Sequence, residues 1–159
     1  MDFQDIESGV VELIRKAETQ LPDDVVKALE SAYKIEKGIA KTQIQAILEN
    51  IKISKESKRP MCQDTGIQTF FVDIGIYFPE INKLKQIISN GVKKATKQIP
   101  LRPNTMDPFT QINHKDNTGL HVPYITWDFS VGSDVKITAF PKGGGSENIS
   151  FFKNFSPSV

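Results

Sequence analysis

The chain has 159 residues, of which 38% are hydrophobic and 25% are charged, and its formal net charge is +1. A chain of this length builds one hydrophobic core, and this composition excludes disordered, collagen-like and membrane-embedded polypeptides. Its lysines are scattered without a basic block, which excludes a nucleic-acid partner.

The N-terminal segment and the cysteine content indicate where the protein works. Acidic residues, Asp2 and Asp5, come before any apolar run, so the basic start and apolar centre of a secretion signal are missing. No apolar stretch is long enough to cross a bilayer, so we expect no membrane association. A single cysteine cannot form an internal disulfide, which favours a reducing compartment. We therefore expect a cytoplasmic protein.

Three helices are expected near the N-terminus. Apolar residues recur at helical spacing over residues 6–17, 25–33 and 40–51. Pro22 and Gly38 lie between these stretches, where helices commonly start and stop. We interpret residues 1–53 as a helical subdomain whose apolar stripes form core and whose charged residues face solvent.

Residues 54–159 are expected to form an α/β part. Residues 67–78 are rich in aromatic and β-branched residues, which predicts a strand, and residues 81–95 carry the apolar stripe of an amphipathic helix. Residues 125–131 and 135–139 alternate between apolar and polar types, and the turn at Gly132 between them predicts a β-hairpin. The expected fold class is α+β, with an N-terminal helical subdomain followed by a mixed or antiparallel sheet and a packed helix.

The only cysteine, Cys62, lies in the polar stretch "RPMCQDTG" ahead of the first expected strand. Lone cysteines are most often small buried hydrophobes, but neighbours such as Gln63 and Asp64 would be costly to bury without partners. A thiol nucleophile would need a base, and no spacing requires His114 or His121 to lie beside it. The third interpretation is a metal or cluster ligand whose polar neighbours act on what the metal binds.

Two further stretches are candidates for anion binding. Arg102 is one of only three arginines and lies between Pro100 and Pro103. A stiffened arginine is suited to gripping a carboxylate through two hydrogen bonds, although an ordinary surface arginine is the alternative. The "KGGGSEN" stretch lacks the spacing of a P-loop or a dinucleotide fingerprint. It is either a flexible turn or an anion-binding nest of backbone N–H groups from Gly144 and Gly145.

Together, the three stretches resemble a known family. "CQDTG" at residues 62–66, "LRPN" with "DP" at residues 101–108 and "PKGGGSEN" at residues 141–148 occur in this order in class I fumarases and L-tartrate dehydratases. The resemblance is to the N-terminal part of the alpha portion and covers essentially the whole chain. It implies reversible hydration of fumarate to L-malate, or dehydration of tartrate to oxaloacetate, at a four-iron four-sulfur (4Fe-4S) cluster whose open iron binds the substrate.

The resemblance also implies residue roles. Cys62 would be the first cluster ligand, and Asp64 would be catalytic through proton transfer. Arg102 would clamp a carboxylate of the small dicarboxylate substrate. The expected substrate-binding residues are Gln63, Asp64, Arg102, Gly144 and Gly145.

Family members carry two further cluster cysteines and a catalytic histidine later in the alpha portion, and other site residues on a beta portion. We therefore expect residues 1–159 to be a single partial domain, inactive alone, that needs the missing alpha residues and a beta subunit or beta domain in a homo- or hetero-oligomer. The expected activity is that of a fumarate hydratase alpha subunit. The alternatives are an L-tartrate dehydratase alpha portion and a non-catalytic folding or assembly module.

Overall fold

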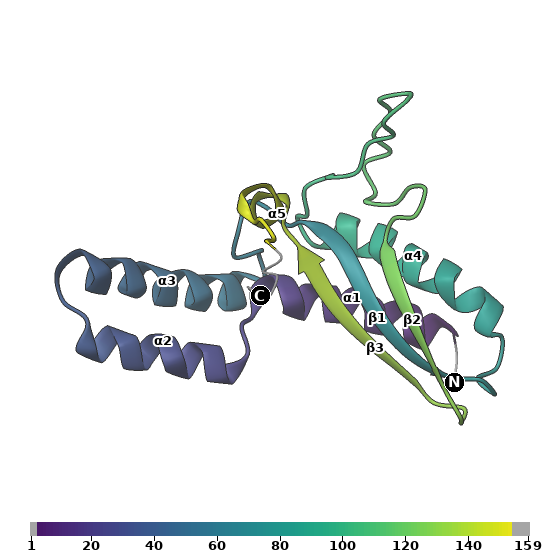
Figure 1. The fold of residues 1–159 in the computed structure, drawn as a ribbon, viewed down its shortest axis with the longest axis horizontal. Coiled ribbons are helices and arrows are strands. Elements are labelled where there is room, and N and C mark those ends of the chain that lie inside the picture. Colours follow the sequence, from purple (N-terminus) through teal and green to yellow (C-terminus); the bar gives the residue numbers. More distant parts are fainter. Residues whose placement is uncertain (1–2, 154–159) are drawn as a thin grey trace, which may run out of the picture.

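The computed structural model describes residues 3–153, except for the side chains of residues 146–148, and it confirms the α+β fold. The elements in chain order are α1 (Phe3–Thr19), α2 (Asp23–Ile35), α3 (Gly38–Ser57), β1 (Ile67–Gly75), α4 (Ile81–Gln98), β2 (Tyr124–Ser130), β3 (Val135–Lys142) and α5 (Gly144–Ile149). The strands form a three-stranded sheet. α1 and α4 back this sheet, and α2 and α3 project to one side (Figure 1). No helix within residues 3–153 combines the length and the apolar character needed to span a bilayer.

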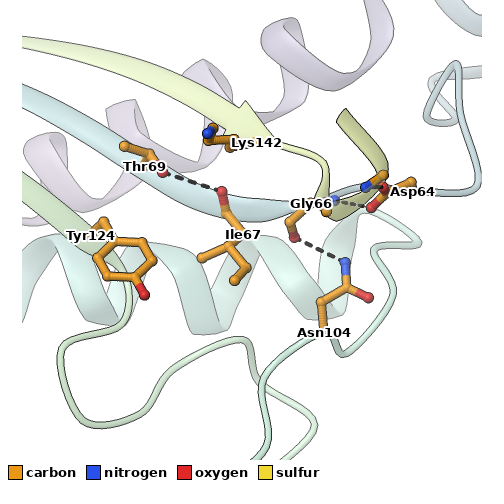
Figure 2. A pocket seen from close by; sticks show the side chains of 9 residues that line it. Asp64, Gly66, Ile67, Thr69, Asn104, Tyr124 and Lys142 are labelled. Carbon is orange, nitrogen blue, oxygen red and sulfur yellow. Dashed lines mark hydrogen bonds between the residues drawn. The ribbon is translucent and has the colours of Figure 1, made fainter. Parts of the chain in front are cut away.

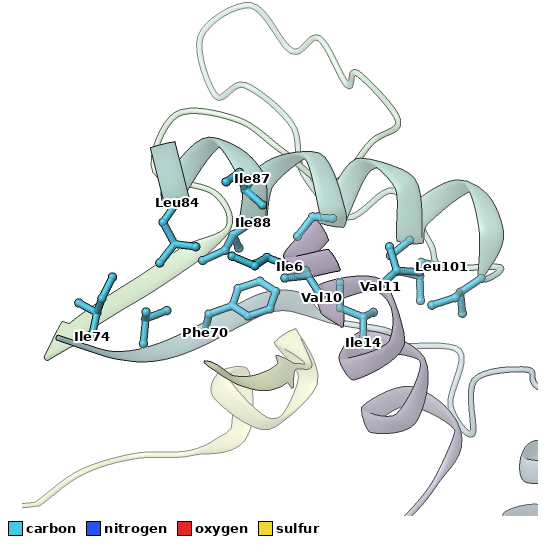
Figure 3. Close-up of a cluster of buried hydrophobic side chains, with 14 of the residues drawn as sticks. Ile6, Val10, Val11, Ile14, Phe70, Ile74, Leu84, Ile87, Ile88 and Leu101 are labelled. Carbon is cyan, nitrogen blue, oxygen red and sulfur yellow. The ribbon is translucent and has the colours of Figure 1, made fainter. Parts of the chain in front are cut away.

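One face of the sheet carries the hydrophobic core, which Figure 3 shows between β1, α1 and α4. Phe70, Val72 and Ile74 alternate along β1 and are at most 1% exposed, because the apolar stripes of the two helices cover them. Gly91 lets α4 approach α1 closely, since a Cβ there would lie 2.6 Å from Cγ1 of Val10. The core residues are Ile6, Val10, Val11, Ile14, Phe70, Val72, Ile74, Phe78, Leu84, Ile87, Ile88, Val92, Ala95, Ile99 and Leu101.

The expected hairpin between β2 and β3 is wrong, because β1 lies between these two strands. β1 pairs in parallel with β2 and antiparallel with β3. The turn after β2 crosses the end of β1, where the amide of Tyr77 donates to the carbonyl of Gly132 at 2.9 Å. A Cβ at Gly75 would collide with the Gly132 backbone, so this crossing requires glycine. Alternation predicts strands correctly but does not identify the partner, and the most apolar strand takes the centre of the sheet.

The expectation that the second and third helices contribute core is also wrong within the described chain. α2 and α3 lie side by side, away from the sheet (Figure 1). α2 has no buried residue, and Ser54 is the one buried residue of α3. Two helices alone cannot enclose an apolar interior, so their stripes shield each other only in part. α1 packs in the core with the sheet, and the subdomain boundary at residue 53 stays a prediction.

The second face of the sheet is open. Phe71 on β1, Tyr124 on β2 and Phe140 on β3 are each about half exposed, at 48%, 53% and 53%. Strand pairing places Tyr124 and Phe140 on either side of Thr69. The open face therefore carries an aromatic group on each strand, close to the end where β1 begins.

Candidate functional site

The three sequence motifs meet where β1 begins. Thr65 Oγ1 accepts a hydrogen bond from the backbone N–H of Arg102 at 3.0 Å, over a sequence separation of 37 residues. Asp64 Oδ2 accepts one from the backbone N–H of Gly145 at 3.3 Å, over a separation of 81 residues. The Gly66 carbonyl accepts a third, at 2.9 Å, from the side-chain amide of Asn104, as Figure 2 shows. The fold thus ties the arginine and glycine motifs to the loop that carries the cysteine.

This junction requires glycine at residue 66. Gly66 has a φ of +62°, in the left-handed region, and a Cβ there would collide with the carbonyl group of Lys142. At Gly143, a Cβ would lie 2.8 Å from Asp64 Oδ2, so the Asp64 side chain would have to shift. The "CQDTG" and "GGG" stretches therefore contact each other through the backbone at Gly66 and through the Asp64 side chain at Gly143.

The Asp64 carboxylate lies between these two stretches. Oδ1 accepts a hydrogen bond from the backbone N–H of Gly66 at 3.1 Å, while Oδ2 accepts the bond from Gly145. The backbone N–H of Asp64 donates in turn to Sγ of Cys62 at 3.4 Å. The N–H of Gly145, which the sequence assigned to a substrate anion, is therefore occupied by the chain's own carboxylate in this structure.

Three cavities border the Cys62–Gly66 loop. One, of about 600 Å³, opens on the uncovered face of the sheet and is lined by Asp64, Thr69, Asn104, Tyr124, Lys142, Gly144 and Gly145. A second, of about 560 Å³, has Glu18, Cys62 and Asp64 among its lining residues. The third, of about 290 Å³, is lined by Cys62, Gln63 and Arg102 together with Arg59, Pro60, Thr65 and Pro100. The six expected site residues therefore gather around one loop, divided among these cavities.

Sequence reasoning missed Asn104 and Tyr124 as lining residues. Asn104 belongs to the quoted "LRPN" motif, and its backbone N–H donates to Oδ1 of the buried Asn117 at 2.8 Å. This contact holds the motif against the irregular segment that follows it. Tyr124 reaches the cavity only because β2 pairs in parallel with β1, and no local pattern indicates that pairing.

The structure bears on each of the three interpretations of Cys62. The side chain is exposed, so the buried-hydrophobe interpretation is wrong. His114 lines a different cavity, formed by residues 105–122, and does not share a cavity with the thiol. No group of three or more His, Cys, Asp and Glu side chains within residues 3–153 is placed to hold a metal ion. A cluster that used the exposed Cys62 thiolate would need its other ligands from outside these residues.

A buried polar pair lies behind the loop, and sequence analysis did not identify it. Glu18 of α1 is 7% exposed and Gln68 of β1 is 1% exposed. The side-chain amide of Gln68 donates to Glu18 Oε1 at 3.0 Å and to the carbonyl of Thr65 at 3.3 Å. Burial raises the pKa of Glu18 to about 7, with the Gln68 hydrogen bond opposing the shift and the charge of Asp64 adding to it.

Replacing Glu18 with glutamine is expected to stabilise the chain at alkaline pH but not in acid. The folded-state pKa near 7 lies above the ordinary value of 4.5, so the stability contributed by the protonated form is complete below 4.5 and is lost as pH rises through 7. Glutamine stays neutral throughout and should raise the free energy of unfolding by about 2 kcal/mol at about pH 8. Urea unfolding at about pH 5 and about pH 8 measures this difference. An equal effect at both values would contradict the assignment.

Comparisons with known proteins identify a family and several relatives. The family model described as fumarate hydratase (Fumerase) matches residues 7–159. A protein of Methanocaldococcus jannaschii, provisionally named L(+)-tartrate dehydratase subunit alpha, is 49% identical over 158 residues, which are 96% of this chain and 55% of that protein. The L(+)-tartrate dehydratase subunit alpha of Escherichia coli is 37% identical over 129 residues, covering 80% of this chain and 43% of that protein.

This chain therefore spans about half the length of the curated relatives it matches. The family match covers nearly the whole sequence, and the three motifs that resemble the family converge on one loop of the structure. The chain belongs to the fumarate hydratase (Fumerase) family of hydro-lyases.

Proposed function

We propose that this chain is the N-terminal portion of the alpha subunit of an iron-sulfur hydro-lyase that dehydrates L-tartrate to oxaloacetate. The observation that carries the proposal is the convergence of Cys62, Asp64 and Arg102 on one loop, in a chain similar to proteins named as L(+)-tartrate dehydratase alpha subunits. Those names favour tartrate over fumarate, the substrate expected first from the sequence. Fumarate is the second candidate because the matching family model is described as fumarate hydratase.

Each residue of the loop has a task in this reaction. Cys62 would hold one iron of a 4Fe-4S cluster, and the bound cluster would supply a Lewis acid for the departing hydroxyl group. Asp64 presents Oδ2 as the proton-accepting atom, with the carboxylate oriented by two backbone N–H groups. The guanidinium of Arg102 binds a substrate carboxylate, and its backbone is fixed by Thr65. Gln63 and Gly144 complete the substrate contacts, while Gly145 contributes through the Asp64 carboxylate that its N–H holds.

The cavity of about 600 Å³ supports a substrate that carries hydroxyl groups. Its wall carries a hydroxyl from Thr69, an amide from Asn104 and a phenol from Tyr124, and Asp64 lines the same cavity. Tartrate has a hydroxyl on each central carbon, whereas fumarate has none, so hydrogen bonds from this wall to a substrate hydroxyl are possible only with tartrate. The remaining cluster ligands and site residues come from further alpha residues and a beta partner, so the chain alone is inactive.

The test uses the full-length alpha subunit assembled with its beta partner and loaded with iron and sulfide without oxygen. We expect kcat/KM for dehydration of L-tartrate to exceed that for hydration of fumarate by about 100-fold. A preference for fumarate would overturn the substrate assignment and favour the second candidate. A loaded assembly that acts on neither substrate would favour a folding or assembly module.

A further inference from the structure

We propose that Gln68 and Glu18 are positioning residues that set the orientation of the Asp64 carboxylate through the peptide group between Thr65 and Gly66. The inference rests on the proposed function in that it assigns Asp64 to the reaction. Neither residue lines the cavity shared by Asp64 and Gly145, whereas Glu18 lines the cavity of about 560 Å³ together with Cys62 and Asp64.

The argument begins with one planar peptide group. Its carbonyl, on Thr65, accepts the hydrogen bond from the Gln68 amide, and its N–H, on Gly66, donates to Asp64 Oδ1. Because a peptide group is rigid and planar, fixing the direction of its carbonyl fixes the direction of its N–H. The Gln68 side chain therefore aims the N–H that holds the carboxylate.

Glu18 fixes Gln68 in turn. Its carboxyl oxygen accepts from the same amide nitrogen that reaches Thr65, at 3.0 Å, and both side chains are almost fully buried. A side chain packed in the interior and held by a hydrogen bond has few rotamers available, so its amide points in one direction. The contacts thus run from α1 through β1 to the loop without passing through solvent.

The other end of the loop is held independently. The backbone N–H of Met61 donates to the carbonyl of Glu18 at 2.9 Å, and the side-chain amide of Asn50 donates to the carbonyl of Met61 at 2.9 Å. Ser54 Oγ lies 3.3 Å from the Thr19 carbonyl oxygen. Loss of the Gln68 amide therefore removes the hydrogen bond that orients the Thr65 carbonyl, while residues up to Met61 keep their contacts.

Stability alone does not require this pair. Gln68 Oε1 has no hydrogen-bond partner within residues 3–153, and a buried carboxyl group costs free energy that apolar side chains of similar volume would avoid. Outside the pair, the Gln68 amide donates a hydrogen bond to the Thr65 carbonyl. Removing this hydrogen bond should therefore change the orientation of the Asp64 carboxylate more than the stability of the fold.

The principal variant is Gln68→Met, in the full-length alpha subunit assembled with its beta partner. It keeps the volume and removes the donor to Thr65. We expect kcat to fall about 10- to 100-fold with KM within about twofold, because misplacing a reacting group acts on the chemical step. Hydrogen exchange of the Gly66 amide should become at least about tenfold faster. The matched control, Gln86→Met, changes an exposed glutamine of α4 that bonds Asn90 and should alter neither quantity.

A second variant separates positioning from packing. The exchange Glu18→Gln with Gln68→Glu restores an amide to carboxylate bond inside the pair, but at alkaline pH residue 68 then has no proton to donate to Thr65. We expect the double variant to recover the thermal stability that Gln68→Glu alone loses, while Gly66 exchange stays fast and kcat stays low. Recovery of kcat in the double variant would overturn the inference.

The two proposals fail in different ways. Gly66 exchange is measured without substrate, so unchanged exchange in Gln68→Met and in the double variant overturns the positioning role whichever substrate reacts. A wild-type assembly that acts on neither substrate overturns the proposed function instead. The exchange of the Gly66 amide then still tests whether Gln68 orients the Thr65–Gly66 peptide.

Discussion

Asp64→Asn in the assembled, iron-loaded enzyme is expected to lower kcat by about 100- to 10,000-fold, the range for loss of a general acid or base. The substitution keeps the shape of the side chain and removes its charge and its proton-accepting oxygen. It also turns an NH₂ group toward one of two N–H donors, those of Gly66 and Gly145, which now hold the carboxylate. Steady-state kinetics with L-tartrate and with fumarate measure the change.

The control for this variant is Asp73→Asn. Asp73 lies on the open face of β1 and is exposed. Its Oδ2 is 3.9 Å from Nζ of Lys136 on the paired strand β3. An exposed pair of this kind contributes little, so kcat should stay within about twofold. Equal kinetics for the Asp64 and Asp73 variants would exclude a role for Asp64 in proton transfer.

Gly66→Ala is expected to lower the free energy of unfolding by about 3 kcal/mol or more. Alanine at a φ of +62° adopts the left-handed region, and its Cβ would collide with the backbone of Lys142, which cannot move without shifting β3. The strand pair would have to open where the cysteine loop meets the glycine-rich stretch. Urea unfolding of the variant and of the wild-type chain measures the loss.

Gly38→Ala separates strain from collision. Gly38 has a φ of +56°, almost that of Gly66, but a Cβ there meets nothing within 4 Å. We expect it to cost only about 1 kcal/mol, the conformational part of the effect. If both variants lost the same free energy, close backbone contact at Gly66 would not be the reason for its glycine.

Local patterns predict those elements whose partners are adjacent or whose hydrophobic face is continuous. The stripe of α4 and the apolar run of β1 are of this kind, and both appear where the sequence indicated. The partners of β2 and β3 depend instead on which strand is most apolar. Local patterns do not reveal this, because it requires comparing segments that lie far apart in the sequence. The same limit applies to α2 and α3, because an apolar stripe shows what a helix can bury but not what covers it.

The candidate site follows the same division. Cys62, Asp64 and Arg102 stand out by residue type and by neighbours, so motif resemblance identifies them. Glu18 has the appearance of an ordinary charged helix residue. It contacts Gln68, which is 50 residues away in the sequence, and no local sequence pattern predicts that contact. A polar residue that supports a site from behind is therefore visible only once the fold is known.

The central place of β1 also has a consequence during synthesis on the ribosome. Both of its neighbours, β2 and β3, are translated later, and β3 ends at Lys142. Until β2 emerges, the nascent chain carries an apolar strand with two unpaired edges, and one edge stays unpaired until β3 follows. This is the form of intermediate that chaperones protect from aggregation. The loop around Cys62 acquires its final shape later still, because Gly145 must emerge before Asp64 can be held.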